Sequence, residues 1–399
     1  MTQSFLASRR PPGWLVFVAA MSVVGPLTID MYLPGFPSIE RDFGEQGVER
    51  TMAAYMIGIA VAQLFFGPIS DRFGRKPPLY VGFFVYALGS LGCALSVNMT
   101  MLTLMRVVQA LGGCAGFVIG RAIVRDRCQP HEAARAFSML MLIFALGPMV
   151  APVLGGAVVT AVGWRGTFYF QALFGTTILI ALHFILSESR NPAEVKPLNL
   201  GGVLRDYWRL ARDPILTGCS LIAGFGMGSM FAYVAGSPTI MANLYSLTPQ
   251  QFGWQIGLNG IAFMSASRLN MIALRNAGPA ELLAKGIWRP TVVSVFLVAA
   301  SVFAGLPLWC MIVLQFCFFI SVGLINPNVA ALGLAPHGKE AGSASALMGS
   351  IQSAVAMLFG SAIAIFNDAT LRPLTIIMAV GALCAWLSFF WVRRAQHHH

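Results

Sequence analysis

Long apolar blocks alternate with short polar interruptions over the whole length of the chain. A helix needs about 20 mainly apolar residues to cross the hydrocarbon core of a bilayer. The blocks reach this length, and the breaks at Gly, Pro and charged clusters predict about twelve membrane-spanning helices. We expect these helices at residues 13–36, 51–70, 78–97, 100–122, 133–160, 165–186, 214–238, 250–272, 288–305, 307–330, 341–366 and 372–392.

One polar interruption is much longer than the others and runs from Ser187 to Asp213. It divides the apolar blocks into two equal sets. The pattern therefore predicts an all-α integral membrane fold with an N-terminal six-helix bundle in residues 1–188, a cytoplasmic linker in 189–213 and a C-terminal six-helix bundle in 214–399. Apolar residues of the linker recur at helical spacing between arginines, as in an amphipathic helix that lies on a membrane surface. A plain solvated linker is the alternative explanation.

Composition and charge agree with a membrane protein, because 57% of the residues are hydrophobic and 10% are charged. The formal net charge of +11 does not require nucleic acid as a partner, since the basic residues lie in short connections where membrane topology explains them. Most of them fall on the side that holds both termini, so the positive-inside rule predicts cytoplasmic termini in a bacterial inner membrane. The last three residues, 397–399, resemble the start of a purification tag.

Two charged residues fall well inside predicted spans: Asp30 in the first and Arg106 in the fourth. A charge in hydrocarbon costs at least about 2.5–3.5 kcal/mol on insertion scales, so both residues are candidates for function. A carboxyl removed from water favours its neutral form, so Asp30 is predicted to take up and release a coupling proton. Arg106 is predicted to tune a nearby carboxyl or to bind substrate. The alternatives are a structural Asp near the outer end of its span and an Arg that packs helices.

Amides and aromatic residues at membrane depth are candidates for lining a substrate cavity. An unpaired amide is costly there, so some of these side chains are expected to face a polar cavity. For any one amide, an interhelical hydrogen bond is the more ordinary explanation, and for an aromatic ring it is core or lipid contact. The candidates are Tyr32, Tyr55, Gln63, Gln109, Phe144, Phe231, Tyr233, Asn259, Asn326, Asn328 and Gln352.

The fifth predicted span is rich in Gly and Pro. Prolines interrupt helical hydrogen bonds and glycines permit close approach, so we expect a bend or tight packing. The eleventh span, which starts at Ala341, is also rich in small residues and holds the corresponding place in the second half. Such correspondence is typical of the internal repeats of transporters. The residues of the fifth span are Gly147, Pro148, Pro152, Gly155 and Gly156.

The connection between the second and third spans carries a specific motif, Gly67-Pro68-Ile69-Ser70-Asp71-Arg72-Phe73-Gly74-Arg75-Lys76-Pro77. It resembles the signature loop of the major facilitator superfamily. The segment from Arg106 to Gln109, with Gly112 and Gly113 beyond, is similar to the fourth-helix motif that this superfamily associates with proton transfer. The Gly/Pro-rich run resembles its fifth-helix antiporter motif. More narrowly, the chain resembles the Bcr/CflA drug-resistance group in residues 29–34, 121–126, 326–328 and 341–347.

This resemblance covers the whole chain and implies two six-helix bundles, related by pseudo-two-fold symmetry, around a central cavity. The bundles would rock between inward-open and outward-open states while drug leaves and protons enter. Asp30 would be the titrating carboxyl and Arg106 its coupling partner. The connection from Arg268 to Lys285 keeps only a degenerate form of the loop motif, which argues against a second gate in that half. The implied gating residues are Gly67, Asp71, Arg72, Gly74 and Arg75, together with the glycines and prolines of the fifth span.

The sequence thus favours a monomeric, proton-coupled exporter of small drug-like molecules, driven by the proton gradient without a cofactor. A transporter of one endogenous metabolite would have the same sequence features. A membrane enzyme is not expected, because it needs a nucleophile, a metal cluster or an acid pair. His131, His183 and His337 are scattered and show no metal-ligand spacing, so no metal site is expected either. A channel remains possible, but it does not need a titrating Asp30.

Overall fold

The computed structural model describes residues 12–128, 130–189, 200–302, 307–366, 368 and 370–397. Every regular element in this part of the chain is helical, and ten of its helices are long and apolar enough to cross a membrane. The predicted all-α membrane fold is therefore confirmed. Linker residues 190–199 and most of the apparent tag lie outside the described residues.

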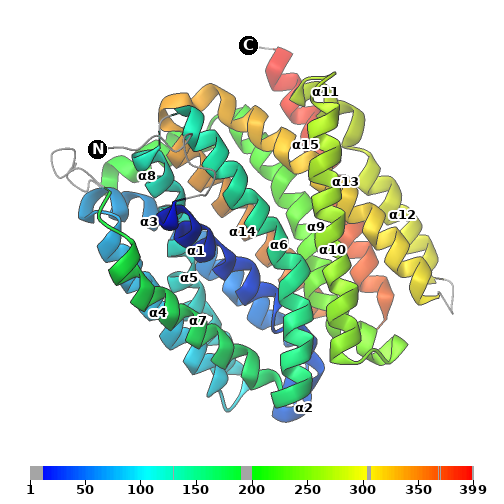
Figure 1. Ribbon diagram of the computed structural model, residues 1–399. Helices are drawn as coiled ribbons and strands as arrows, with labels where there is room; N and C mark the ends of the chain where they lie inside the picture. Colours follow the sequence, from blue (N-terminus) through cyan, green and yellow to red (C-terminus); the bar gives the residue numbers. More distant parts are fainter. Residues whose placement is uncertain are drawn as a thin grey trace.

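The first half of the chain forms one group of helices, with the longest of them, α6, at the border with the second group (Figure 1). Within the group, α5 packs against α3 and α4, and α1 packs against α6. Leu15, Phe83 and Tyr86 lie in one of the buried clusters that hold the group together. The elements are α1 (Gly13–Asp30), η1 (Leu33–Gly35), α2 (Phe36–Phe43), α3 (Glu49–Phe73), α4 (Lys76–Ala94), α5 (Met99–Arg127), α6 (Pro130–Val162) and α7 (Trp164–Ile185).

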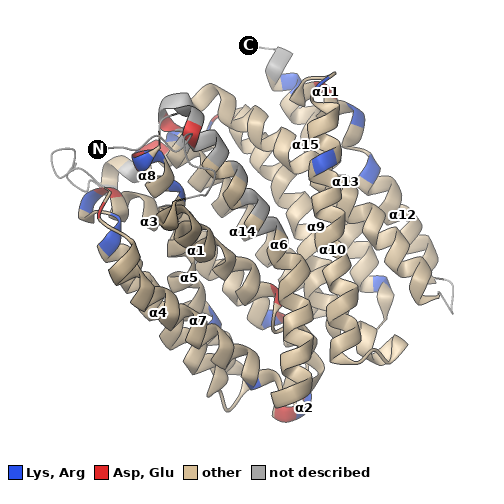
Figure 2. Cartoon of the chain, in the orientation of Figure 1, with Lys and Arg blue, Asp and Glu red and all other residues tan. Residues whose placement is uncertain are grey.

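The second half forms the other group, in which α9 packs against α14 and α15, and α13 packs against α10. Most charged residues lie near the ends of the helices, as a bilayer requires (Figure 2). The elements are α8 (Leu200–Ala211) in the linker, α9 (Pro214–Tyr245), α10 (Pro249–Ala273), α11 (Pro279–Gly286), α12 (Arg289–Val302), α13 (Leu308–Leu334), η3 (Ala335–Glu340), α14 (Ala341–Phe366) and α15 (Leu371–His397).

Three predicted spans look different in the structure. The first is interrupted after Asp30, where α1 gives way to a turn, η1 and α2. Two others, α6 and α10, are not among the ten apolar helices of the described part. Within α6, the segment Leu146–Val162 is apolar but shorter than the ten helices. Helix α10 carries several amides, including Gln255 and Asn259, which lower its hydropathy.

The linker holds an amphipathic helix, α8. Its Tyr207 and Leu210 are buried, whereas Trp208 points outward and is 63% exposed. The Tyr207 hydroxyl donates a hydrogen bond to the carbonyl of Leu64 in α3, and Arg209 forms an ion pair with Glu340 beside α14. Helix α8 therefore contacts both halves, which meet where α6 packs along α10 and α3 packs along α14.

Candidate functional site

The first span is interrupted by a kink and not by an unwound segment, since Met31 and Tyr32 keep right-handed helical φ and ψ angles. Helix α1 ends at Asp30, close to the centre of the candidate span Gly13–Phe43, and the chain then turns through Met31 and Tyr32 before η1 begins. The Asp30 side chain is partly buried, and within the described residues its carboxylate forms no hydrogen bond or ion pair. Pro34 has no backbone N–H to donate to the carbonyl of Asp30, four residues earlier, so this proline accounts for the kink. Asp30 therefore lies at a kink of the first span with a carboxylate that has no bonding partner among the described residues, which makes it a candidate for function.

Arg106 of α5 lies beside this kink and is completely buried. One of its terminal nitrogens, Nη1, donates to the carbonyl of Thr28 at 3.2 Å and to Oε1 of Gln109 at 2.6 Å. The guanidinium lies 4.3 Å from the ring centroids of both Tyr32 and Tyr55. In the described structure its Nε and Nη2 have no hydrogen-bond partner. Arg106 thus contacts the helix that carries Asp30 but forms no ion pair with it, so their predicted coupling stays a prediction.

Gln109 belongs to a buried hydrogen-bond network inside the first half. Its Nε2 donates to Ser90 Oγ of α4 at 2.7 Å and to Gln171 Oε1 of α7 at 2.8 Å. These contacts are interhelical hydrogen bonds, the more ordinary explanation for an amide. Ser90 and Gln171 were missed in the sequence, although Gln171 is a membrane-depth amide of the same kind as the residues that were selected.

The second half has a similar amide network. Gln255 Nε2 donates to the hydroxyl of Tyr233 at 2.7 Å and to Gln315 Oε1 at 2.8 Å, and Gln315 Nε2 donates to Asn259 at 2.5 Å. Asn328 donates to Asn270 in the same way. Tyr233, Asn259 and Asn328 therefore bond within their own half, and sequence inspection missed Gln255 and Gln315.

Other cavity candidates lie where the two halves meet. Gln63 of α3 donates to Ser353 Oγ of α14 at 3.2 Å. Phe231 of α9 packs against a cluster that joins Tyr55 of the first half to Ala356 of α14. Gln352 is partly buried on α14. Asn326 instead lies within the second half, where it lines a small pocket with Ile222 and Phe318, and its buried Oδ1 has no partner in the described structure. The side chain of Phe144 lies outside the described residues.

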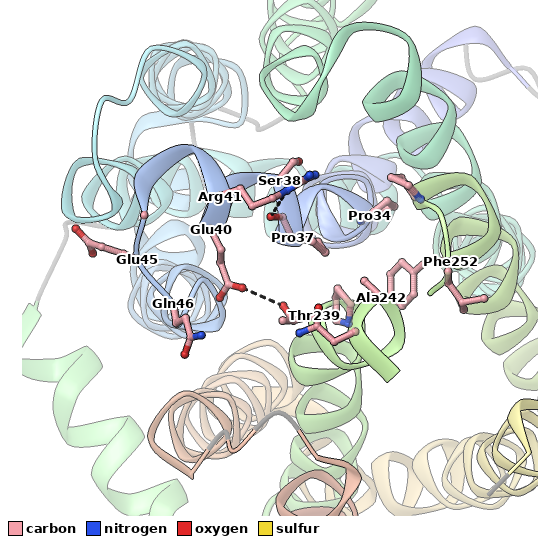
Figure 3. Close-up of a pocket in the computed structure, with 15 residues that line it drawn as sticks. Pro34, Pro37, Ser38, Glu40, Arg41, Glu45, Gln46, Thr239, Ala242 and Phe252 are labelled. Atoms are coloured by element: carbon pink, nitrogen blue, oxygen red, sulfur yellow. Dashed lines mark hydrogen bonds between the residues drawn. The ribbon is translucent and has the colours of Figure 1, made fainter. Parts of the chain in front are cut away.

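A cavity of about 500 Å³ lies at the end of the molecule opposite α8, between α2 and the helices α9 and α10 (Figure 3). Pro34, Pro37 and Phe252 line it. Across it, Glu40 accepts a hydrogen bond from the Thr239 hydroxyl at 3.5 Å. This bond links the two halves at that end. The cavity candidates predicted from the sequence are not among its lining residues.

The signature loop is organised around Arg75, whose side chain is 4% exposed. Its Nη1 donates to Asp71 at 2.7 Å and to Ser70 at 2.8 Å, while its Nε donates to Asp126 of α5 at 2.7 Å. Burial lowers the pKa of Arg75, but the hydrogen bonds with Asp126 and Asp71 outweigh it, so the net direction is upward. Asp126 was noted in the sequence only as part of a group resemblance, without a role. Gly74 takes a positive φ of 86° at the turn that aims Arg75 inward.

Arg75→Lys is expected to destabilise the protein, because Lys cannot reproduce the planar fork that binds two carboxylates. Loss of a partner from a buried ion pair costs about 3–5 kcal/mol, and a lysine, which keeps the positive charge but lacks the fork, should lose somewhat less. Thermal unfolding in detergent measures the effect. Arg72→Lys is the matched control, since the neighbouring Arg72 side chain is exposed. Equal unfolding temperatures for the two variants would contradict a structural role for this fork.

The glycines of α6 lie against backbone on both sides. A methyl group at Gly155 would overlap the carbonyl oxygen of Met31 in the kinked first span. One at Gly156 would lie 2.6 Å from the carbonyl oxygen of Pro249, at the start of α10. Helix α6 therefore fits closely between α1 of its own half and α10 of the other, and this tight packing agrees with the sequence-based expectation. Gly147 is similarly close to Pro26 of α1.

Comparisons with known proteins agree with this arrangement. Residues 18–361 match the model of the Major Facilitator Superfamily. The chain is 34% identical to the "Uncharacterized MFS-type transporter YdgK" of Bacillus subtilis (strain 168), with 96% of each chain covered. It is 28% identical to the "Bicyclomycin resistance protein homolog" of Haemophilus influenzae, with 95% of this chain and 96% of the relative covered.

Among solved structures, the fold is similar to that of a D-xylose-proton symporter, with a TM-score of 0.72 and 13% identity over 94% of this chain and 97% of that one. The predicted family resemblance is confirmed, and with it the expectation that the protein is not an enzyme. Because the family model and full-length relatives both match, the chain belongs to the major facilitator superfamily and is a multi-pass membrane transporter.

Proposed function

We propose that the protein is a proton-coupled antiporter that exports small drug-like molecules by alternating access. The observation that carries this proposal is Asp30, a carboxyl without a bonding partner in the described structure, placed at the kink of the first span. A carboxyl in such surroundings can take up a proton from one side and release it to the other as its exposure changes. The bicyclomycin-resistance relative supports an exporter of drug-like substrates.

In the proposed architecture α6 and α10 also cross the membrane, which completes twelve spans in two pseudo-symmetric bundles, residues 1–188 and 214–399. Their amides and glycines face protein, so low hydropathy does not prevent insertion. The end that carries α8 and both termini would be cytoplasmic, in a bacterial inner membrane. We propose that the transporter works as a monomer and takes its energy from the proton gradient alone, without a cofactor.

The contact between the halves supports a rocking motion. Between α6 and α10 it consists largely of glycine against backbone, as at Gly156 and at Gly253, which faces the carbonyl of Pro152. Few side-chain hydrogen bonds hold the halves together in the described part of the chain. Gln63 forms one hydrogen bond with Ser353, and Thr239 forms one with Glu40. Such an interface can separate at one end while it closes at the other. Arg75 and its carboxylates would then act as a gate near the cytoplasmic end.

The proposal is tested with purified protein in proteoliposomes that carry an imposed pH gradient. We expect transport of several unrelated drug-like compounds toward the acidic side, and we expect these compounds to compete with one another. An ionophore that collapses the pH gradient should reduce the flux to that of empty vesicles. Transport of one compound without competition from the others would favour the single-metabolite alternative, and flux that ignores the gradient would refute antiport.

A further inference from the structure

Arg106 is a buried cation whose charge the protein does not fully compensate. Its side chain has 0% exposure, and both groups that accept its hydrogen bonds, the Thr28 carbonyl and the Gln109 amide, are neutral. Removing a guanidinium from water is costly unless an opposite charge and hydrogen bonds replace the lost hydration. Within the described residues no carboxylate forms an ion pair with it. The positive charge is therefore left for an anion from outside the chain that reaches Arg106 when its covering side chains move.

The free donors of Arg106 have the geometry of a carboxylate-binding fork. Nε and Nη2, the two nitrogens without a partner, lie on the same edge of the planar guanidinium. Their parallel N–H bonds match the two oxygens of one carboxylate. The rings of Tyr32 and Tyr55, at 4.3 Å, and of Phe168, at 5.9 Å, attract the cation through their π systems. These rings hold the guanidinium in place, and the Tyr32 hydroxyl interacts with Arg106, but none of the described carboxylates meets the free edge.

The fork also lies close to the boundary between the two halves, which gives a second and independent reason to place a ligand there. Tyr32 stands in the turn that follows α1, and its hydroxyl lies 3.2 Å from Thr51 Oγ1 of α3. Tyr55, which lies against Arg106, packs in a cluster with Ala356 and Phe231 of the second half, and secondary transporters bind substrate between their halves. The opposite half differs, because α9 runs unbroken from Pro214 to Tyr245 and its Tyr233 bonds with Gln255.

We infer that Arg106 binds a carboxylate of the transported molecule, so that the substrates include organic carboxylates, free acids and zwitterions alike. This inference rests on the proposed function and specifies its substrate class. In this structure Arg106 is fully buried, and the rings of Tyr32 and Tyr55 lie against its guanidinium. Binding therefore requires Tyr32 or Tyr55 to turn away from the guanidinium as the two halves move.

A matched pair of ligands tests the inference. 2-Naphthoate and 2-naphthamide have nearly the same shape but differ in charge, and their affinities for the full-length protein in detergent can be measured by tryptophan fluorescence. We expect the wild type to bind the carboxylate at least about tenfold more tightly, as charge-assisted hydrogen bonds imply. Arg106→Gln should reduce this ratio to near one without changing the affinity for the amide. Arg268→Gln, at an exposed arginine of α10, should keep the ratio.

Equal affinities of the two ligands for the wild type would overturn the inference without any variant, so a poorly folded Arg106→Gln does not prevent the test. Chloride that displaces naphthoate at comparable concentration would mean that Arg106 holds an inorganic counter-ion, which also overturns the substrate assignment. Gradient-driven efflux of a neutral compound reports separately on the proposed function. Efflux without a carboxylate preference refutes only this inference, and a carboxylate preference without gradient-driven flux refutes only antiport.

Discussion

Asp30→Asn is expected to abolish transport driven by a pH gradient while leaving exchange that does not depend on the gradient. Asn has the size and hydrogen-bonding capacity of a protonated Asp but cannot release a proton. Asp30 lies near the centre of the span Gly13–Phe43 and has no partner in the described structure that would fix its charge. Flux in proteoliposomes, measured with and without the gradient, checks the result. The gradient-dependent part should fall to the level of empty vesicles.

Glu281→Gln is the matched control for this experiment. Its carboxylate forms a surface ion pair with Lys285 in α11 and is 52% exposed. Surface pairs of this kind contribute about 0–1 kcal/mol, and we expect transport to be unchanged. If Asp30→Asn keeps gradient-driven flux while folding normally, the coupling carboxyl lies elsewhere and the central site assignment is wrong.

Gly155→Ala is expected to impair both stability and transport, because the added methyl group would overlap the backbone carbonyl of Met31. Backbone cannot turn aside as a flexible side chain can, so α6 or the kinked first span must shift. Overpacking of this kind typically costs about 1–3 kcal/mol. Thermal unfolding measures the loss of stability, and flux in proteoliposomes shows whether the halves still rock.

Gly286→Ala separates this packing effect from any general effect of replacing a helical glycine. Gly286 ends α11, and a methyl group there would meet nothing within 4 Å. Its unfolding temperature should stay close to that of the wild type. If Gly155→Ala behaves in the same way, the contact between α6 and the first span is looser than the structure indicates and does not constrain transport.

The sequence alone was sufficient for the class of fold and for the main residues of interest. A span in a bilayer must be long and apolar, so its pattern is visible without any knowledge of its neighbours. The same solvent makes a charge at membrane depth costly, which singled out Asp30 and Arg106. Gly and Pro in the fifth span indicated close packing for an equally local reason, since both act through their own backbone.

Partnerships between distant residues could not be predicted in this way. Arg75 meets Asp126 only because α3 and α5 pack side by side, and its backbone N–H meets Glu188 because the end of α7 returns to the same place. From the sequence, Gln109 was a candidate for the substrate cavity and Gln171 was not selected. Only the packing of their helices brings the two amides into hydrogen-bond contact.

Tertiary structure also decided the two features on which the proposed mechanism depends. Composition does not reveal what surrounds Asp30 at the kink of the first span, although the kink itself follows from Pro34, which cannot donate to the carbonyl four residues earlier. It does not reveal that Arg106 lies between Tyr32 and Tyr55 with one edge free. The sequence determined which side chains have a high free-energy cost in the membrane. The packing of the helices decided which of them find a partner inside the protein and which have donors left for a ligand.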